Sequence, residues 1–568
     1  MKRIFYNGIV RTVDERRPVA EAVAVQDGII MAVGSDDDVA AWAAGGQSRA
    51  TAGSADAASD VEWIDLEGKL MVPGFHDSHL HLLSYGLSLE KVNLGQAKSI
   101  DDIVTEGRAF LKARLVEFDG PQGVPAGWWL QGRGWNNDYW EDSRFPNRYD
   151  LDRITTEYPV TYTRACGHII VVNTKALEIM GVTRETPQIA GGRIDLDEDG
   201  EPLGIFREAA RDLVYNAIPR LSVEDIKRLL VKGAIPMVRC GITAIQSDDL
   251  EAVPEADYQR VIDAMTQLDS EGKLPLRVFE QCLLPPVARF REFIAKGYRT
   301  DKRGSGVEGN GRFRIGPLKL LADGSLGGRT AFLSGPYADD PQTCGIPVFT
   351  QEELDELVKE AHDHDMIMAI HCIGDGTMRM AFESIEKAQK DNPKLDMRHG
   401  LVHCQITDEG LLKQFRDLNV VAHVQPIFID YDMHIVRDRV GEAMEKTSYN
   451  WKSMLDLGVH VAGGSDSPVE SFHVLNNLYC AVTRRGLDGQ PEEGWLPDQK
   501  MSLEEALYIF TMGGAYASYD ERVNGSITVG KQADFAVIDR NIFDLDPEEI
   551  KKADVVMTVI DGEIAYRK

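Results

Sequence analysis

The stretch PGFHDSHLH, residues 73–81, places two histidines two positions apart directly after a short apolar run. On a β-strand, side chains two positions apart face the same side. His79 and His81 can therefore present two imidazoles to one point. This spacing predicts a metal site, provided that further ligands lie nearby.

Further groups of the ligand type lie on, at the end of or just after strand-like apolar runs later in the chain: Lys319, His371, His403 and Asp466. Three or more histidines with a carboxylate suit Zn²⁺ or a similar divalent ion. A free lysine is cationic at neutral pH and repels a metal ion. Lys319 fits such a site only if its charge is removed or converted to an anionic carbamate; as a plain ion-pair partner or neutral donor, it would leave a site for one ion instead of two.

Strand-like runs alternate with amphipathic helical stretches, which is typical of a βα-repeat fold. The runs lie near residues 71–75, 242–246, 276–283, 315–321, 367–371, 400–403, 420–424 and 460–465. Eight strands close a (β/α)₈ barrel, also called a TIM barrel, whose site lies at the C-terminal ends of the strands. Lys319 lies on the fourth of these strands, and the other predicted ligands end or follow a strand, as such a site requires.

A typical barrel needs about 250 residues, and the interval between the first and last runs is longer. Residues from about 110 to 220 therefore form a predicted insertion between the first two strands. Short strands with Asn-Gly and Asp-Gly turns occur at both ends of the chain, with a low-complexity loop at 45–60. We expect a small β-sandwich from residues 1–70 and 505–568, with the barrel spanning 71–504 and the last helix following it.

The composition excludes several classes of partner. With 91 acidic and 62 basic residues the net charge is −29, which disfavours nucleic acid and anionic membrane surfaces. Seven scattered cysteines, without a CxxC pair, are typical of reduced thiols in a cytoplasmic protein. The sequence shows neither a signal peptide nor an apolar run of about 18 residues.

The order HxH, Lys, His, His, Asp on successive strands resembles the metal-dependent amidohydrolase superfamily. The stretches PGFHDSHLHL, LKLLADGSLGGRTAFLSGPY, HCIGDGT, RHGLVHCQ, GGSDSPV and RACGH are similar to its YtcJ-like branch, which includes N-substituted formamide deformylases. The likeness covers nearly the whole chain. It implies one or two divalent metal ions per chain, an N6-carboxylated Lys319 that bridges them, and a homodimer.

These groups predict hydrolysis of a carbon–nitrogen bond in a small-molecule amide other than a peptide. A bound divalent ion makes hydroxide available at neutral pH, and the metal-bound hydroxide would attack the amide carbonyl. Asp466 is the predicted catalytic acid and base. The resemblance points to N-substituted formamides as the first substrate class.

Six other polar or aromatic residues are predicted to contact the substrate. Four lie in the insertion, in the motifs GRGWNN and TRACGH: Trp135, Asn136, Arg164 and His168. Asp323 and Arg329 follow the fourth strand, either as an ion pair that shapes the site or as substrate contacts.

Other functions stay open at this point. A heterocycle deaminase of the superfamily usually carries a glutamate three residues after the strand-five histidine, where this chain has Gly374. A lactone or cyclic amide would use the same core. A non-catalytic regulator or ligand-binding protein on the same fold is the alternative of another class.

Overall fold

A computed structural model describes residues 1–44, 61–253, 257–284, 286–304 and 311–568. They form two compact units. The core unit consists of Met1–Ser84 and Val223–Lys568, and the inserted unit consists of Tyr85–Ser222. The insertion thus begins earlier than the predicted boundary near residue 110, and the predicted loop at 45–60 lies outside the described residues.

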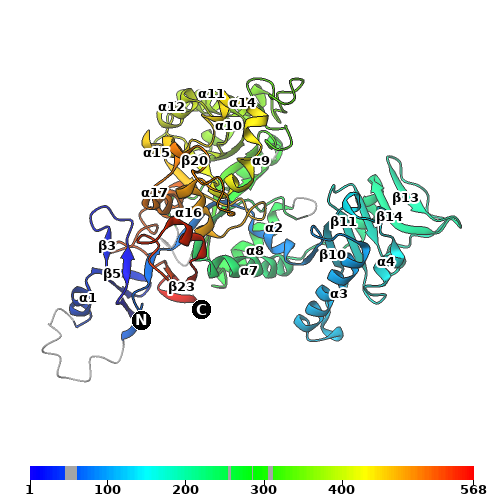
Figure 1. Ribbon diagram of the computed structural model, residues 1–568, viewed down its shortest axis with the longest axis horizontal. Coiled ribbons are helices and arrows are strands. Elements are labelled where there is room, and N and C mark those ends of the chain that lie inside the picture. The colour runs from blue at the N-terminus through cyan, green and yellow to red at the C-terminus, as the bar shows by residue number, and fades with distance from the viewer. Residues whose placement is uncertain (45–60, 254–256, 285, 305–310) are drawn as a thin grey trace. The chain divides into compact units, whose positions relative to one another are not determined.

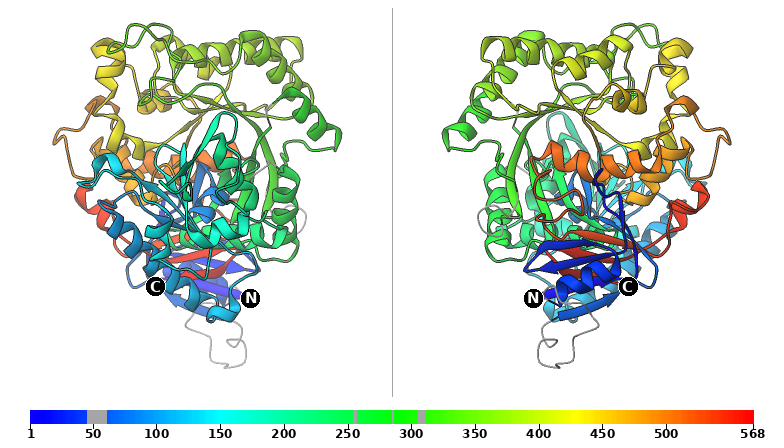
Figure 2. Two further views of the ribbon diagram at one scale, coloured as in Figure 1. Left: turned by 90° about the vertical axis from the view of Figure 1, so that its right-hand side faces the viewer. Right: turned by 90° about the vertical axis from the view of Figure 1, so that its left-hand side faces the viewer.

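An eight-stranded parallel sheet occupies the centre of the core unit (Figures 1 and 2). Its strands are hydrogen-bonded in chain order: β8 (Phe75–Leu80), β15 (Ile242–Ser247), β16 (Arg277–Leu283), β17 (Phe313–Leu321), β18 (Met368–Cys372), β19 (Gly400–His403), β20 (Val421–Val424) and β21 (Val461–Gly463). The backbone N–H of Asp466, beyond β21, donates to the carbonyl of His79 on β8 over 2.8 Å. This bond joins the two ends of the sheet, which confirms the predicted (β/α)₈ barrel.

Helices of the core unit surround the barrel (Figures 1 and 2): α7 (Val223–Arg239), α8 (Tyr258–Ser270), α9 (Val287–Ala295), α10 (Gln351–Asp363), α11 (Asp375–Asp391), α12 (Glu409–Asp417), α13 (Ile429–Asp432), α14 (Val436–Glu445), α15 (Trp451–Asp456), α16 (Val474–Thr483), α17 (Leu503–Tyr508) and α18 (Gly514–Ala517). The local sequence explains α10. Thr350 and Glu353 bond to each other's backbone N–H in a capping box. Leu354, Leu357 and Val358 are buried at helical spacing.

The predicted first strand at 71–75 is wrong in its placement. Leu70–Pro73 form β7, which pairs with the C-terminal strand β22 (Phe535–Ile538) outside the barrel. The barrel strand starts only at Phe75 and contains His79. The chain changes sheets at Gly74, where a Cβ atom would lie 2.3 Å from the Thr243 hydroxyl, so only glycine allows this close crossing.

Both chain termini build the small β-sandwich, as predicted. One sheet contains β5 (Ile29–Gly34), β4 (Ala22–Gln26), β1 (Lys2–Tyr6) and β6 (Val61–Asp65), and the other contains β24 (Glu563–Arg567), β23 (Val555–Ile560), β22, β7, β2 (Ile9–Arg11) and β3 (Val19–Ala20). Phe5 and Phe535 meet edge to face with ring centroids 5.6 Å apart. They belong to a shared apolar core of N-terminal and C-terminal residues.

The inserted unit has its own sheet and core. The sheet contains β13 (Gly192–Leu196), β14 (Pro202–Glu208), β12 (Ile169–Val172), β11 (Val160–Arg164), β10 (Leu130–Trp135) and β9 (Lys91–Asn93). Its helices are α3 (Ile100–Glu117), α4 (Arg148–Asp152), α5 (Thr174–Met180) and α6 (Asp212–Ala217). The helix α2 (Leu82–Ser88) leads into this unit, and α1 (Asp36–Ala43) belongs to the sandwich. Trp135, Tyr162 and Phe206 are fully buried within the inserted unit.

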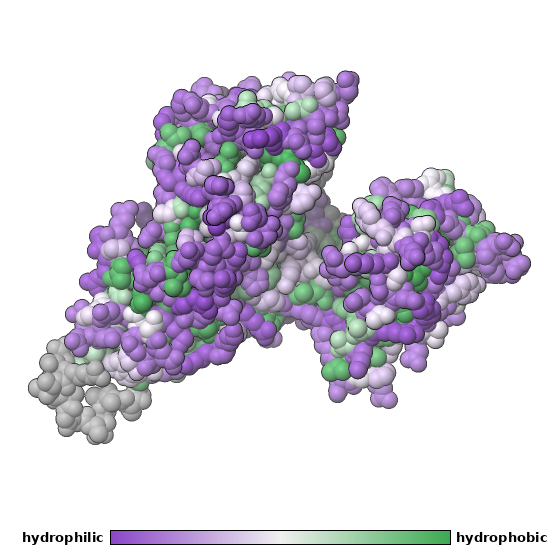
Figure 3. Space-filling model, viewed as in Figure 1, coloured by the Kyte–Doolittle hydropathy of each residue, from purple (hydrophilic) through white to green (hydrophobic). Residues whose placement is uncertain are grey.

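Hydrophilic side chains cover most of the face seen in Figure 3. Among the described residues, no helix combines the length and the apolar character that a membrane span requires.

Candidate metal centre

The barrel brings the six predicted ligands to the C-terminal ends of its strands. His79 lies on β8 with His81 just beyond it, while Lys319, His371 and His403 lie on β17, β18 and β19. Asp466 follows β21. Lys319, His403 and Asp466 are buried along with His79.

Short distances connect these groups. Asp466 Oδ1 lies 3.1 Å from His81 Nε2 and 3.3 Å from His79 Nε2. Lys319 Nζ lies 3.0 Å from His79 Nε2. The ring centroid of His403 is 5.6 Å from that of His79 and 4.5 Å from that of His371. Ligand atoms of His79, His403 and Asp466 all lie within 4.8 Å of one another, as a metal site requires.

The other ring nitrogen of each histidine faces a protein oxygen. His79 Nδ1 lies 2.7 Å from Gln281 Oε1, and His403 Nδ1 lies 2.8 Å from Gln425 Oε1. Each glutamine amide donates in turn to a backbone carbonyl, which orients its oxygen toward the imidazole. A proton held on Nδ1 leaves the Nε2 lone pair for a metal ion.

The remaining two histidines follow the same pattern with different partners. His371 Nδ1 lies 2.9 Å from Asp323 Oδ1, and His81 Nδ1 lies 3.1 Å from the backbone carbonyl of Asp248. All four rings are thus oriented by acceptors outside the ligand set. This donor set fits a divalent metal ion of the zinc type.

The pKa values of the ligands reflect burial and mutual charge. Burial, followed by the charge of Lys319, lowers the pKa of His79 to about 3. Burial also opposes the charged form of His81, but the hydrogen bond to Asp466 and the charge of Asp248 outweigh it and raise the pKa of His81 to about 9. The negative field that holds a proton on His81 also attracts a metal cation.

Lys319 is completely enclosed, and burial lowers the pKa of its ammonium although the carboxylates of Asp248 and Asp466 oppose this shift. Removal of the charge from a buried lysine makes its nitrogen lone pair available for reaction.

Backbone strain accumulates beside the ligands. His403 has a φ of 80°, Cys404 of 50° and Asp466 of 60°. Non-glycine residues adopt such angles at a cost of about 1–3 kcal/mol each, and they occur often at functional sites.

Asp323 and Arg329 do not form an ion pair with each other. The Asp323 carboxylate accepts from the backbone N–H groups of Phe332, Ile373 and Gly374 and from His371. Arg329 instead pairs with Asp339 over 2.8 Å. Asp323 therefore orients a predicted ligand, while Arg329 belongs to a separate surface pair.

The predicted substrate residues of the insertion lie within the inserted unit. Trp135 is fully buried, with its indole N–H donating to the carbonyl of Tyr162, so its ring packs in the core. Arg164 donates to Asn136 Oδ1 over 2.6 Å. His168 is exposed and lies 2.9 Å from Glu208.

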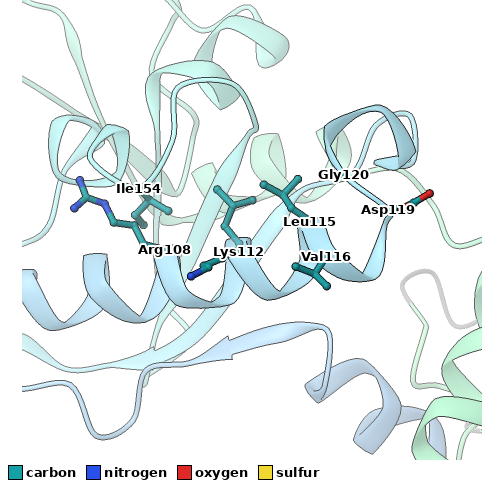
Figure 4. Close-up of a pocket in the computed structure, with 8 residues that line it drawn as sticks. Arg108, Lys112, Leu115, Val116, Asp119, Gly120 and Ile154 are labelled. Carbon is teal, nitrogen blue, oxygen red and sulfur yellow. The ribbon is translucent and has the colours of Figure 1, made fainter.

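A cavity of about 590 Å³ lies along α3 in the inserted unit (Figure 4). Leu115, Val116 and Ile154 line it together with Arg108 and Lys112. None of the predicted site residues is among its lining residues.

The sequence-based prediction missed Gln281, Gln425 and the carbonyl of Asp248. A signal for the glutamines was present: each is a polar residue at or just beyond the C-terminal end of an apolar strand, β16 or β20. That the two glutamines accept from His79 and His403 follows only from the distances in the folded structure.

Known proteins resemble the whole chain. The sequence model of the Amidohydrolase family matches residues 62–566. The "Putative amidohydrolase YtcJ" of Bacillus subtilis (strain 168) is 33% identical over 570 residues, covering 100% of both chains. An N-substituted formamide deformylase of Arthrobacter pascens is 27% identical over 573 residues, covering 99% of this chain and 98% of that protein.

Among solved structures, an uncharacterized metal-dependent hydrolase from Pyrococcus horikoshii OT3 superposes with a TM-score of 0.74 at 27% identity. The match covers 96% of this chain and 99% of that one.

Proposed function

The chain belongs to the amidohydrolase family, and from this premise we propose that it is a metal-dependent hydrolase of a non-peptide amide bond. One observation carries the proposal. Four imidazoles turn Nδ1 toward protein oxygens, which leaves their Nε2 atoms as ligands beside the Asp466 carboxylate and a buried lysine.

Two groups of residues would hold the metal. His79, His81 and Asp466 form one group, and His371 and His403 form the other. Lys319 would serve both after carbamylation: its neutral nitrogen attacks the carbon of CO₂, and the product loses a proton to become an anionic carbamate. A divalent ion bound there, Zn²⁺ for this donor set, supplies a Lewis acid that polarises a carbonyl and lowers the pKa of water.

Asp466 would transfer the proton. Its Oδ1 lies beside the imidazoles of His79 and His81, and burial of its carboxylate is outweighed by their hydrogen bonds, which hold its pKa well below the ordinary range. It would accept a proton from the attacking water and return it to the departing nitrogen.

N-substituted formamides are the first substrate class to test. The relative from Arthrobacter pascens carries this activity in its name and aligns over nearly the whole chain. The absence of a glutamate three residues after His371 disfavours deamination. Substrate contacts by Asn136, Arg164 and His168, homodimer formation and a cytoplasmic location stay predictions from the sequence.

The test is elemental analysis of protein purified without chelator, combined with assays on a panel of N-substituted formamides. We expect about two divalent ions per chain and release of formate. His79→Ala and Lys319→Ala should lose most metal and activity, whereas His364→Ala, at an exposed position outside the site, should keep both. A parent protein free of metal after refolding with Zn²⁺ would contradict the proposal, and metal binding without hydrolysis of any amide would favour the ligand-binding alternative.

A further inference from the structure

A cluster of hydrogen-bond acceptors lies beside the ends of β19, β20 and β21. Tyr449 Oη donates to Asp432 Oδ2 over 2.7 Å, and Gln405 Nε2 donates to the same oxygen over 3.3 Å. The backbone N–H of Tyr449 donates to the carbonyl of Gln405 over 2.7 Å. Glu470 follows β21, and burial with the charges of Asp430 and Asp432 raises its pKa. We call Gln405, Asp432 and Glu470 the acceptor cluster.

The acceptor cluster has no cationic partner in the described part of the chain. Among the described residues, no lysine or arginine forms an ion pair with Asp432 or Glu470. Arg484 donates through Nη1 to the Tyr449 carbonyl over 3.2 Å. Gln405 is only 2% exposed, yet no group of the described residues donates to its Oε1. A buried acceptor without a donor costs about 1–3 kcal/mol. The fold therefore holds two carboxylates and a free acceptor that are not paired with any described cation.

The acceptor cluster lies on segments that adjoin the candidate metal centre. Gln405 lies two residues after His403, and Glu470 lies four residues after Asp466. Asp432 ends α13, which follows Gln425, the partner of His403. The ring of Phe428 in the same connection stacks on the His403 imidazole with centroids 5.8 Å apart. The segments that carry Gln405 and Asp432 therefore adjoin His403, one of the predicted ligands.

The cluster is also held in a strained arrangement. Tyr449 is buried and has a φ of 53°, and this conformation directs its backbone to Gln405 and its hydroxyl to Asp432. Burial raises the pKa of Asp432 to about 6. Burial, with the charges of Asp430 and Asp432, raises the pKa of Glu470. A bound cation would reverse both effects.

We infer that Gln405, Asp432 and Glu470 bind a protonated primary amine of the substrate. The inference rests on the proposed function, and it narrows the substrate to an amide that carries an ammonium group. An ammonium has three N–H donors and no acceptor, which matches three acceptors from three segments. A hard divalent ion would require about six oxygen ligands, more than these side chains offer.

The first experiment compares two isosteric substrates, N-pentylformamide and N-(4-aminobutyl)formamide, which differ by a terminal methyl or ammonium group. We expect kcat/KM to favour the aminobutyl compound by at least about tenfold. Asp432→Asn and Glu470→Gln should remove this preference while hydrolysis of the pentyl compound and the metal content persist. Asp438→Asn, the same change at an exposed position of α14, should leave the preference intact.

A second measurement separates this inference from the proposed function. Calorimetry with pentylamine, and with uncharged 1-pentanol as the control, reports binding without catalysis. Pentylamine binding that is lost in Asp432→Asn supports the amine site even if no formamide is hydrolysed. Equal hydrolysis of both formamides, or pentylamine binding no tighter than that of 1-pentanol in the parent protein, would overturn the amine site and leave the hydrolase proposal standing.

Discussion

Asp323 acts on the metal centre through His371. Its carboxylate accepts from His371 Nδ1 over 2.9 Å, and the other three histidines have uncharged acceptors: two glutamine amides and a backbone carbonyl. A carboxylate acceptor makes an imidazole more basic and fixes its tautomer. The metal affinity at His371 should therefore depend on this charge.

We expect Asp323→Asn to lower the affinity for a metal ion held by His371 about 10- to 100-fold, because an amide cannot supply the charge. The measurement is the metal-to-protein ratio after dialysis against buffers of graded free Zn²⁺. Asp339→Asn removes a carboxylate from the neighbouring surface pair with Arg329 and serves as the control. Equal affinities in the parent and Asp323→Asn would refute the role, provided that both proteins have the same circular dichroism.

His399 gives a prediction for stability against pH. It is buried, lies 3.0 Å from His362 Nδ1, and burial followed by the charge of His362 lowers its pKa to about 3. The unfolded chain takes up this proton below a pH of about 6.5 whereas the folded chain does not, so folding stability falls as the pH falls from about 6.5 toward about 3.

His399→Gln removes this titration and keeps a donor for His362. The loss of unfolding free energy between about pH 7 and about pH 5 should shrink by about 2 kcal/mol in the variant. Urea unfolding at both pH values measures it. An unchanged loss would mean that His399 takes up its proton at the same pH in the folded and in the unfolded protein.

The sequence predicted the ligands better than their partners. The HxH spacing and the strand ends predicted one cluster, and the fold brings its members together, whereas their role as metal ligands stays a prediction: His79, His81, Lys319, His371, His403 and Asp466. Gln281 stands 202 residues from His79 in the chain, and no local pattern relates them. Residues that contact a predicted ligand from a distant part of the chain can therefore be identified only from the folded structure.

At the scale of elements, β8 and β21 close the barrel through an unusually close approach. A Cβ atom at Gly464 would lie 2.7 Å from the backbone nitrogen of His79. Only a residue without a side chain allows β8 to approach the segment that carries Asp466. The geometry of both ligands thus depends on this glycine.

Gly464→Ala should destabilise the protein by about 1–3 kcal/mol and reduce its metal content, because β8 must move away from Asp466. Thermal unfolding and elemental analysis measure the two effects. Gly335→Ala, where the added atom meets nothing within 4 Å, is the matched control. A Gly464→Ala protein with full metal content would show that the barrel closes without this contact.

Seven of the eight barrel strands agree with the sequence-based ranges, since short apolar runs between helical stretches identify buried parallel strands. The exception is the run at 71–75, because it spans two strands. Val72 pairs with Ala536 in the sandwich, whereas Phe75 begins the barrel. Apolar character is the same in both sheets, and the crossing at Gly74 depends on distant residues.

At the scale of the whole molecule, a metal ion at the candidate site would stabilise the folded core unit, because this unit contains all six predicted ligands. Removal of metal with a chelator should lower the thermal midpoint, because an ion at a hundredfold excess over its Kd stabilises the folded state by about 2.7 kcal/mol. Scanning calorimetry before and after addition of Zn²⁺ measures this shift. His79→Ala should show little response to either treatment, and a parent protein without any response would argue against a tight site.

The pairing of β7 with β22 sets an order of events during synthesis. The first sandwich strands leave the ribosome when almost the entire barrel is still untranslated, and their partner sheet is complete only when β24 emerges. Until then the apolar faces around Phe5 and Val23 remain open to other chains, a state that favours aggregation. Translation speed and chaperone supply should therefore govern the yield of this protein more strongly than that of a barrel with a local N-terminal domain.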